Sequence, residues 1–260
     1  MTRRRSFSLS GISVVVLGSA CALLAQPPGG GRGFRPGGEF GGFGGGGLPN
    51  FAEKTITGAP FSANLTSQSV QTLANGNQIQ RQETGEVARD SQGRVYVQTT
   101  TTRPGASGNQ TISSITIYDP VAGYIYRLNP QRMTAVQLSI RPRPSPPTNA
   151  SPPRNSSQVQ TQNLSPQTIN GVTASGTQVT RTIPAETVGN TQPIQIVRVT
   201  WISTALQIPV QITRTDPRTG TSSMNLTNIV QSEPNASLFT VPSGYTLSSA
   251  AARGRRAFPR

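Results

Sequence analysis

The chain contains no histidine and only one cysteine, Cys21, so the commonest general base and the commonest thiolate nucleophile are almost absent. Acidic residues are also few, with nine Asp and Glu against 23 Lys and Arg and a formal net charge of +14. Lys54 is the only lysine, so nearly all of this positive charge is arginine. The absences argue against catalysis by histidine, cysteine or a thiolate-bound metal, while the charge favours anionic partners.

The N-terminus has the layout of an export signal. Arg3–Arg5 precede an apolar stretch, Leu9–Ala25, that is short for a membrane-spanning helix. We predict a signal peptide over residues 1–25 and therefore an exported protein, periplasmic or extracellular, whose mature chain has no transmembrane span. Without Arg3–Arg5 the formal charge is +11, since three positive charges leave the +14.

The cleavage site is expected between Leu23 and Gln26. A lipoprotein interpretation would make Cys21 the lipidated first residue. We do not favour lipid anchoring at Cys21, because Gly18 stands where such a signal needs a large aliphatic residue and apolar residues follow the cysteine.

A glycine-rich stretch follows the leader. Twelve of the nineteen residues from 29 to 47 are glycine, and such a composition has too few side chains to offset the entropy of ordering its backbone. We therefore predict a disordered tether over residues 26–50. The alternative is a nucleic-acid-binding segment in which Arg32 and Arg35 contact phosphates and phenylalanines stack on bases, but export removes that partner, and no nucleic acid is expected.

After Phe51 the apolar residues alternate with polar ones, which predicts strands with one buried face. No run of ten or more residues has convincing helical spacing, and Thr, Val and Ile dominate the periodic segments. The segments with this pattern include Val95–Val97, Val136–Ile140 and Leu206–Ile212. Ile194–Val199 instead carries apolar residues on both faces, which predicts a more central strand.

Four short sequences predict tight turns between these strands. Three begin with Asp and end with Gly, at 90–93, 119–123 and 216–220, and a fourth is Asn75-Gly76-Asn77. Asp can accept hydrogen bonds from the turn backbone, and Gly can adopt the positive φ that closes a hairpin. Neighbouring strands joined by such turns predict a mainly β fold, an antiparallel meander sheet with few or no long helices.

Six prolines between Arg141 and Pro153 cannot belong to a ladder, because proline lacks an amide donor. We interpret residues 141–158 as a proline-rich surface loop within a single β domain spanning residues 51–247. Residues 248–260 contain four arginines after three alanines and are expected to form a disordered basic tail.

Candidate chemistry is sparse. Without histidine, acid–base catalysis would depend on carboxylates. The three turn aspartates already have a structural role, and Glu39 lies in the predicted tether with Glu53 near its end. That leaves four glutamates with no paired spacing, Glu83, Glu86, Glu186 and Glu233. No serine nucleophile motif or calcium loop is present. We therefore expect no catalytic residue, no metal site and no cofactor, and we predict that the protein is not an enzyme. A catalytic glutamate pair is the alternative.

The C-terminal pattern resembles a known superfamily. Trp201, the strand 206–212, the turn DPRTG, the segment Met224–Ile229 and the ending LFTVPSGY are similar to the closing strands of the LolA and RseB-like lipoprotein carriers. This resemblance covers Val197–Tyr245 and implies an open half-barrel around an apolar concavity. The chain also resembles exported β-rich proteins of Acidobacteria-type genomes, which share Asp90–Arg94, Asp119–Leu128 and Phe239–Tyr245. That second resemblance implies no activity.

Two functional hypotheses follow. The first is a non-enzymatic envelope or secreted protein that binds an apolar or amphipathic envelope ligand, such as a lipid or lipoprotein, in a concave β face. Trp201 is expected to fill the core and is the candidate ligand contact. The second is a structural protein that binds an anionic polysaccharide through flexible basic arms. The polyanion contacts would be Arg32, Arg35, Arg253, Arg255 and Arg256.

Overall fold

The computed structural model describes residues 51–52, 54–105, 108–140 and 158–249. The chain divides into two units, Met1–Gly37 and Gly38–Arg260, and all the described residues belong to the second. The predicted signal peptide, the tether, residues 141–157 of the proline-rich loop and most of the basic tail therefore lie outside the described residues, while Gln158 begins β7.

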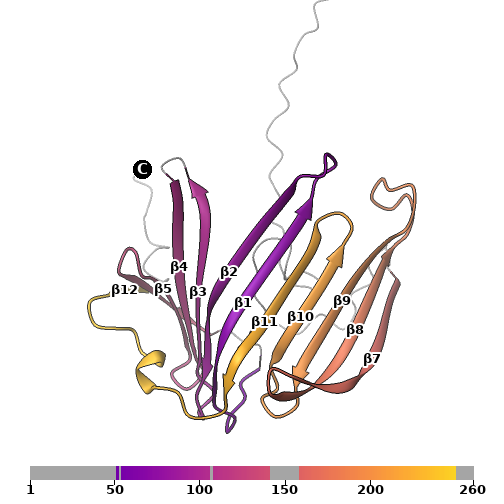
Figure 1. The fold of residues 1–260 in the computed structure, drawn as a ribbon. Coiled ribbons are helices and arrows are strands. Elements are labelled where there is room, and N and C mark those ends of the chain that lie inside the picture. Colours follow the sequence, from indigo (N-terminus) through magenta and orange to yellow (C-terminus); the bar gives the residue numbers. More distant parts are fainter. Residues whose placement is uncertain (1–50, 53, 106–107, 141–157, 250–260) are drawn as a thin grey trace, which may run out of the picture. The chain divides into compact units, whose positions relative to one another are not determined.

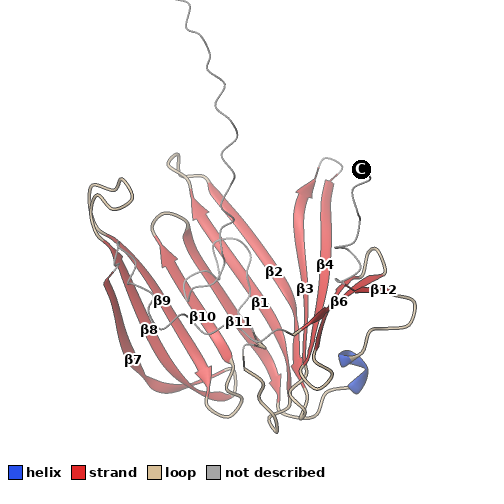
Figure 2. Ribbon diagram, turned by 180° about the vertical axis from the view of Figure 1, so that it is seen from behind, coloured by secondary structure: helices blue, strands red, loops and turns tan. Residues whose placement is uncertain are grey.

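The described residues of this second unit form one twelve-stranded sheet (Figure 1). Its strands are β1 (Phe61–Thr72), β2 (Gln78–Arg89), β3 (Val95–Gly105), β4 (Gly108–Asp119), β5 (Tyr124–Asn129), β6 (Thr134–Ser139), β7 (Gln158–Ile169), β8 (Val172–Ile183), β9 (Ile194–Ser203), β10 (Pro209–Asp216), β11 (Gly220–Val230) and β12 (Thr246–Ser249). One short 3₁₀ helix, η1 (Ala236–Phe239), is the only helix in the described ranges and is blue in Figure 2.

The strand order is β12-β6-β5-β4-β3-β2-β1-β11-β10-β9-β8-β7. Two meanders, β1 to β6 and β7 to β11, meet where β1 pairs antiparallel with β11. All the pairs are antiparallel except β12 with β6, which is parallel. The sheet is open, because β12 and β7 each have one neighbour. The predicted mainly β, antiparallel meander is confirmed, and an open sheet is what the half-barrel expectation requires.

The predicted turns are confirmed as hairpins. Asp119 closes the β4–β5 turn by accepting hydrogen bonds from the backbone amides of Val121 and Ala122 at 3.0 and 2.9 Å. Gly123 ends that turn with a φ of 78°. Asp90 does the same between β2 and β3, where its Oδ1 accepts from the amides of Gln92 and Arg94. These bonds set the registers of the flanking strands.

The two faces of the sheet carry different clusters. We call the face with Phe61, Ala63 and Leu65 of β1 the core face, and these side chains are all buried. They belong to a cluster with buried residues from eight other elements or loops, including Val87, Val95, Ile208, Ile212, Met224 and Leu226. Fully burying a side chain such as Leu65 contributes about 2 kcal/mol.

The opposite face, which carries Ser62 and Asn64 of β1, is called the pocket face. Towards the β6 side of the sheet it holds a second cluster, made of Ala88, Tyr96, Ile117, Leu128, Ala135 and Phe239. The cross-strand pairs Ala88–Tyr96, Tyr96–Ile117 and Leu128–Ala135 place these residues in adjoining rows. Phe239 comes from η1, which packs on this face.

Three expectations about the strands are wrong. The strand predicted from Leu206 begins only at Pro209, because Ser203–Ile208 form a turn in which the Gln207 amide donates to the Ser203 carbonyl at 2.8 Å and Gln207 has a φ of 52°. Leu206 and Ile208 are nevertheless buried. Their spacing of two comes from a turn that directs both side chains into the core.

The second concerns the ending LFTVPSGY, which the resemblance placed among the closing strands. Residues 236–239 form η1, because Asn235 caps it with a hydrogen bond from the Ser237 amide, and the last strand is β12.

The third expectation concerns the buried face of β6. There the fully buried side chain is Ala135, whereas Val136 and Leu138 are half-buried. The alternation identified β6 but not the face that carries its tightest packing.

Candidate functional site

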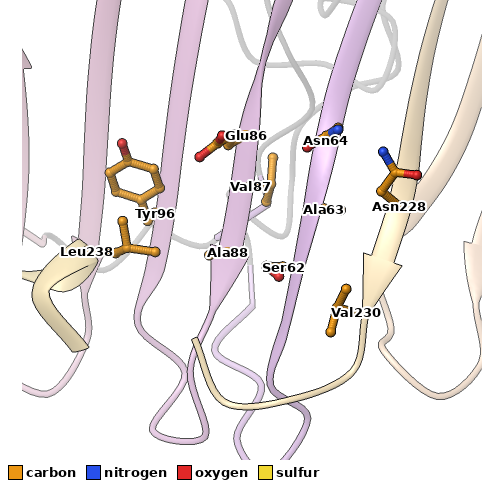
Figure 3. Close-up of a pocket in the computed structure, with 10 residues that line it drawn as sticks. All are labelled: Ser62, Ala63, Asn64, Glu86, Val87, Ala88, Tyr96, Asn228, Val230 and Leu238. Atoms are coloured by element: carbon orange, nitrogen blue, oxygen red, sulfur yellow. The ribbon is translucent and has the colours of Figure 1, made fainter. Parts of the chain in front are cut away.

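A pocket of about 300 Å³ lies on the pocket face, where β3, β2, β1 and β11 run side by side (Figure 3). Its lining comprises Ser62, Ala63, Asn64, Glu86, Val87, Ala88, Tyr96, Asn228, Val230 and Leu238. The volume is at the lower end of the range for small-molecule sites. The site therefore suits a small molecule or one segment of a longer one.

The register of the strands builds the pocket as two rows. One row runs Tyr96–Ala88–Ser62–Val230 across four strands. In the next row Glu86 of β2 lies opposite Asn64 of β1. Figure 3 shows Glu86, Asn64, Asn228 and the Tyr96 hydroxyl along one side of the pocket, with Leu238, Ala88 and Val230 along the other. The site is thus amphipathic, with polar groups gathered on one side and a second side that is apolar apart from Ser62.

A β-bulge places Asn228 in this site. Between the pairs Ser62–Val230 and Asn64–Thr227, β11 has one residue more than β1, and Asn228 has a φ of 51°. A bulge interrupts the alternation of a strand and redirects a side chain. The extra residue in β11 therefore brings an amide to the pocket rim.

Tyr96 forms one wall of the pocket. Its hydroxyl donates to Gln98 Oε1 at 2.7 Å, and its side chain is 7% exposed. Burial raises the pKa of Tyr96 above 10.0, and the negative charge of Glu86 and the nearby Tyr245 raise that pKa further. Tyr96 is therefore a hydrogen-bonding phenol at neutral pH and not a base.

The segment that follows β11 supplies the Leu238 wall. Its η1 packs against β3 and β4, and the guanidinium of Arg94 lies 5.2 Å from the centre of the Phe239 ring. The Nε atom of Arg94 also donates to Asp90 Oδ2 at 2.5 Å. The β2–β3 turn therefore holds the segment that encloses one side of the pocket.

The candidate residues from the sequence lie elsewhere. Trp201 in β9 is half-buried, packs against the core-face cluster and is not among the residues that line this pocket. Its ring lies so close to Gly176 that a Cβ there would be 2.5 Å from the nearest ring carbon. The five proposed polyanion contacts, at positions 32, 35, 253, 255 and 256, lie outside the described residues.

The four glutamates do not converge. Glu83 and Glu86 are three residues apart in β2 and therefore point to opposite faces. Glu186 lies in the loop after β8, and Glu233 binds Ser91 of the β2–β3 turn. Of these four, only Glu86 lines the pocket. Sequence spacing gave no sign of this role, which depends on the register and on the bulge at Asn228.

Two further features concern the described part of the chain. There, no group of three or more acidic, histidine or cysteine side chains is arranged to hold a metal ion. No helix in those ranges has both the length and the apolar character needed to cross a membrane.

Comparison with solved structures gives distant matches. The complex of MucA and MucB from Pseudomonas aeruginosa matches with 12% identity and a TM-score of 0.40, over 77% of this chain and 62% of that one. The LolA superfamily protein NE2245 from Nitrosomonas europaea matches with 11% identity and a TM-score of 0.29, over 73% and 94%. LprF from Mycobacterium bovis matches with 12% identity and a TM-score of 0.28, over 68% and 90%.

The chain spans less than two thirds of the length of the chain that it matches in the first structure. No protein-family model matches the sequence, and no curated protein matches it significantly. TM-scores below one half carry no argument about function, so the functional conclusion rests on the pocket and the sequence.

Proposed function

We propose that this protein is a non-enzymatic binding protein of the cell envelope that holds a small amphipathic molecule in the pocket between β3 and β11. The pocket is the observation that carries the proposal. Ala88, Leu238 and Val230 offer an apolar surface, and Asn64, Glu86 and Asn228 offer a polar rim beside it. Export follows from the arginine-led apolar N-terminus, and the ligand would be a component of the envelope.

The polar rim favours a ligand with a hydrogen-bond donor or a positive charge at one end. Among the described residues that line the pocket, Glu86 is the only charged one, and none is arginine or lysine. A carboxylate attracts a cationic head group and repels an anionic one. An alkylamine should therefore bind more tightly than the fatty acid of the same chain length.

The test is a titration of the mature protein with N-phenyl-1-naphthylamine, a neutral amphipathic dye whose fluorescence rises in apolar sites. Asn64 is exposed and its side chain lines the pocket, so Asn64→Phe should fill the site and weaken dye binding about tenfold or more. Gln68→Phe is the matched control, since Gln68 is also exposed and lies on the same face of β1, two rows away.

Octylamine and octanoate then compete for the bound dye. We expect octylamine to displace it at lower concentration, and Glu86→Gln to reduce that preference. Equal loss of dye binding in Asn64→Phe and Gln68→Phe, or dye binding that both variants leave intact, would contradict the proposed site.

A further inference from the structure

A row of basic residues crosses the core face, on the other side of the sheet from the pocket. Ser69 of β1 is seven residues after Ser62, and β1 pairs with β2 without a register shift, so the two serines point to opposite faces. From Ser69 the row continues through Ser222 and Arg214 to Arg198. At the other end of the row Arg81 pairs with Ser69.

Arg198 and Arg214 are direct cross-strand neighbours. Side chains in such positions have Cβ atoms about 5 Å apart, and like charges placed there destabilise a sheet. Arg181 of β8 lies on the same face, because it is two residues after Val179, which pairs with Arg198. Three guanidinium groups are thus gathered on adjoining strands, β8, β9 and β10.

The carboxylate beside them is already engaged. Asp216 is 1% exposed, and its Oδ2 accepts hydrogen bonds at 2.8 Å from the Nη2 atoms of both Arg214 and Arg218. Its Oδ1 accepts from the Arg218 Nε at 3.0 Å and from the Arg218 amide at 3.1 Å. The one negative charge of Asp216 is therefore shared between the guanidinium groups of Arg214 and Arg218.

Arg214 retains unused donor capacity in a dry setting. Its side chain is 11% exposed, and its Nε atom is buried without a hydrogen-bond partner in the structure. A buried donor without a partner is costly, and an anion removes that cost. Arg181 and Arg198 have interactions of their own, so a bound anion would share their donors. At the far end of the row, Glu83 lies two residues from Arg81 in β2.

We infer that Arg198 and Arg214, with Arg181 beside them, form a binding site for a phosphate or sulfate group on the core face. Guanidinium groups present donors in a planar fork that matches the oxygens of these anions. The hydroxyl of Ser222, opposite Arg214, is a further donor within the row. This site is separate from the amphipathic pocket, and each can fail without the other.

The experiment is calorimetric titration of the mature protein at low ionic strength with two probes, inorganic phosphate and glycerol 1-phosphate. Similar affinities would identify a free anion as the ligand, and at least tenfold tighter binding of glycerol phosphate would identify a lipid head group. Both outcomes support the site. Binding should weaken as sodium chloride is added, because salt screens the charges.

Arg198→Gln should weaken binding of the tighter probe about tenfold to a hundredfold, since it removes a hydrogen bond between charged groups. Arg132→Gln is the matched control: it removes the same charge from an exposed residue in the β5–β6 turn and should change affinity less than twofold. If circular dichroism shows that Arg198→Gln does not fold, Arg181→Gln takes its place. No binding of either probe to the unmodified protein, or an equal loss in Arg132→Gln, would overturn the inference.

Discussion

The carboxylate of Glu233 accepts hydrogen bonds at 3.2 and 3.1 Å from the backbone amide of Ser91, although the two residues are 142 positions apart. Ser91 lies in the turn between β2 and β3, and Glu233 lies between β11 and η1. The contact fastens the segment that supplies Leu238 to the turn beside the pocket.

Replacing Glu233 by Gln should loosen this segment without unfolding the sheet. The amide oxygen of glutamine is a weaker acceptor than a carboxylate, and the site is exposed, so we expect a loss of about 1 kcal/mol or less in the free energy of unfolding. Hydrogen exchange of the Ser91 amide should become faster, while that of the Leu65 amide in β1 should not change. Unchanged exchange at Ser91 would contradict the contact.

Asp216 should make stability depend on pH in the acid range. The hydrogen bond from the Arg218 side chain, opposed by burial and aided by the Arg218 amide and the charges of Arg218 and Arg214, lowers the pKa of Asp216 below 3.8. A lowered pKa in the folded state stabilises the protein above the unfolded pKa, and this stabilisation is lost as the pH falls from about 3.8 through the folded value.

The Asp216→Asn variant tests this dependence. At neutral pH it should lower the free energy of unfolding by about 3 kcal/mol, because it leaves the largely buried Arg214 without its carboxylate. Urea unfolding at several pH values should show a smaller loss of stability below the ordinary aspartate pKa in Asp216→Asn than in the unmodified protein. An equal loss of unfolding free energy with falling pH in the two proteins would contradict the lowered pKa of Asp216.

The close approach of Trp201 to Gly176 gives a spectroscopic prediction. A methyl group at position 176 would lie 2.5 Å from the ring carbon Cζ3 of Trp201, so Gly176→Ala must displace the indole. Because Trp201 is the only tryptophan, its fluorescence reports that movement directly. We expect a shifted emission maximum and a loss of about 1 to 3 kcal/mol in stability. Ser175→Ala, at the exposed neighbouring position, should leave the emission unchanged.

Tyr96 should titrate above its ordinary pKa of 10.0, because burial, Glu86 and Tyr245 all favour the neutral phenol. The tyrosinate absorbance of the protein, compared with that of Tyr96→Phe, isolates this group. Glu86→Gln should move the titration to lower pH by removing one of the three causes. If Glu86→Gln leaves the pKa of Tyr96 unchanged, the charge of Glu86 does not act on Tyr96. That result would contradict the placement of the two side chains in one pocket.

The sequence was sufficient for the architecture because its signals are local. Asp119 and Gly123 specify a hairpin from within five consecutive residues, and the same chemistry recurs at Asp90 and Asp216. The alternation of apolar residues then supplied strands with one buried face. Both signals extend over only a few consecutive residues, so they can be recognised in a single sequence.

The two proposed sites depend on strand register, which brings together residues far apart in the sequence and which no local sequence pattern indicates. Arg198 and Arg214 are sixteen residues apart and become neighbours only through the register of β9 and β10. Asn228 reaches the pocket because of a bulge that β11 shows only when paired with β1. The ending around Phe239 was mistaken for a strand because its apolar residues anchor a 3₁₀ helix on the second cluster instead.

Mapping of a bound ligand by NMR tests the central claim most directly. Adding octylamine to the isotope-labelled mature protein should shift the backbone amide signals of Asn64, Glu86, Tyr96 and Asn228, which come from four strands and meet only at the pocket. The amides of Arg198 and Thr213, outside that pocket, should stay in place. Shifts confined to other regions, or no shift at any octylamine concentration below its micelle limit, would contradict the account.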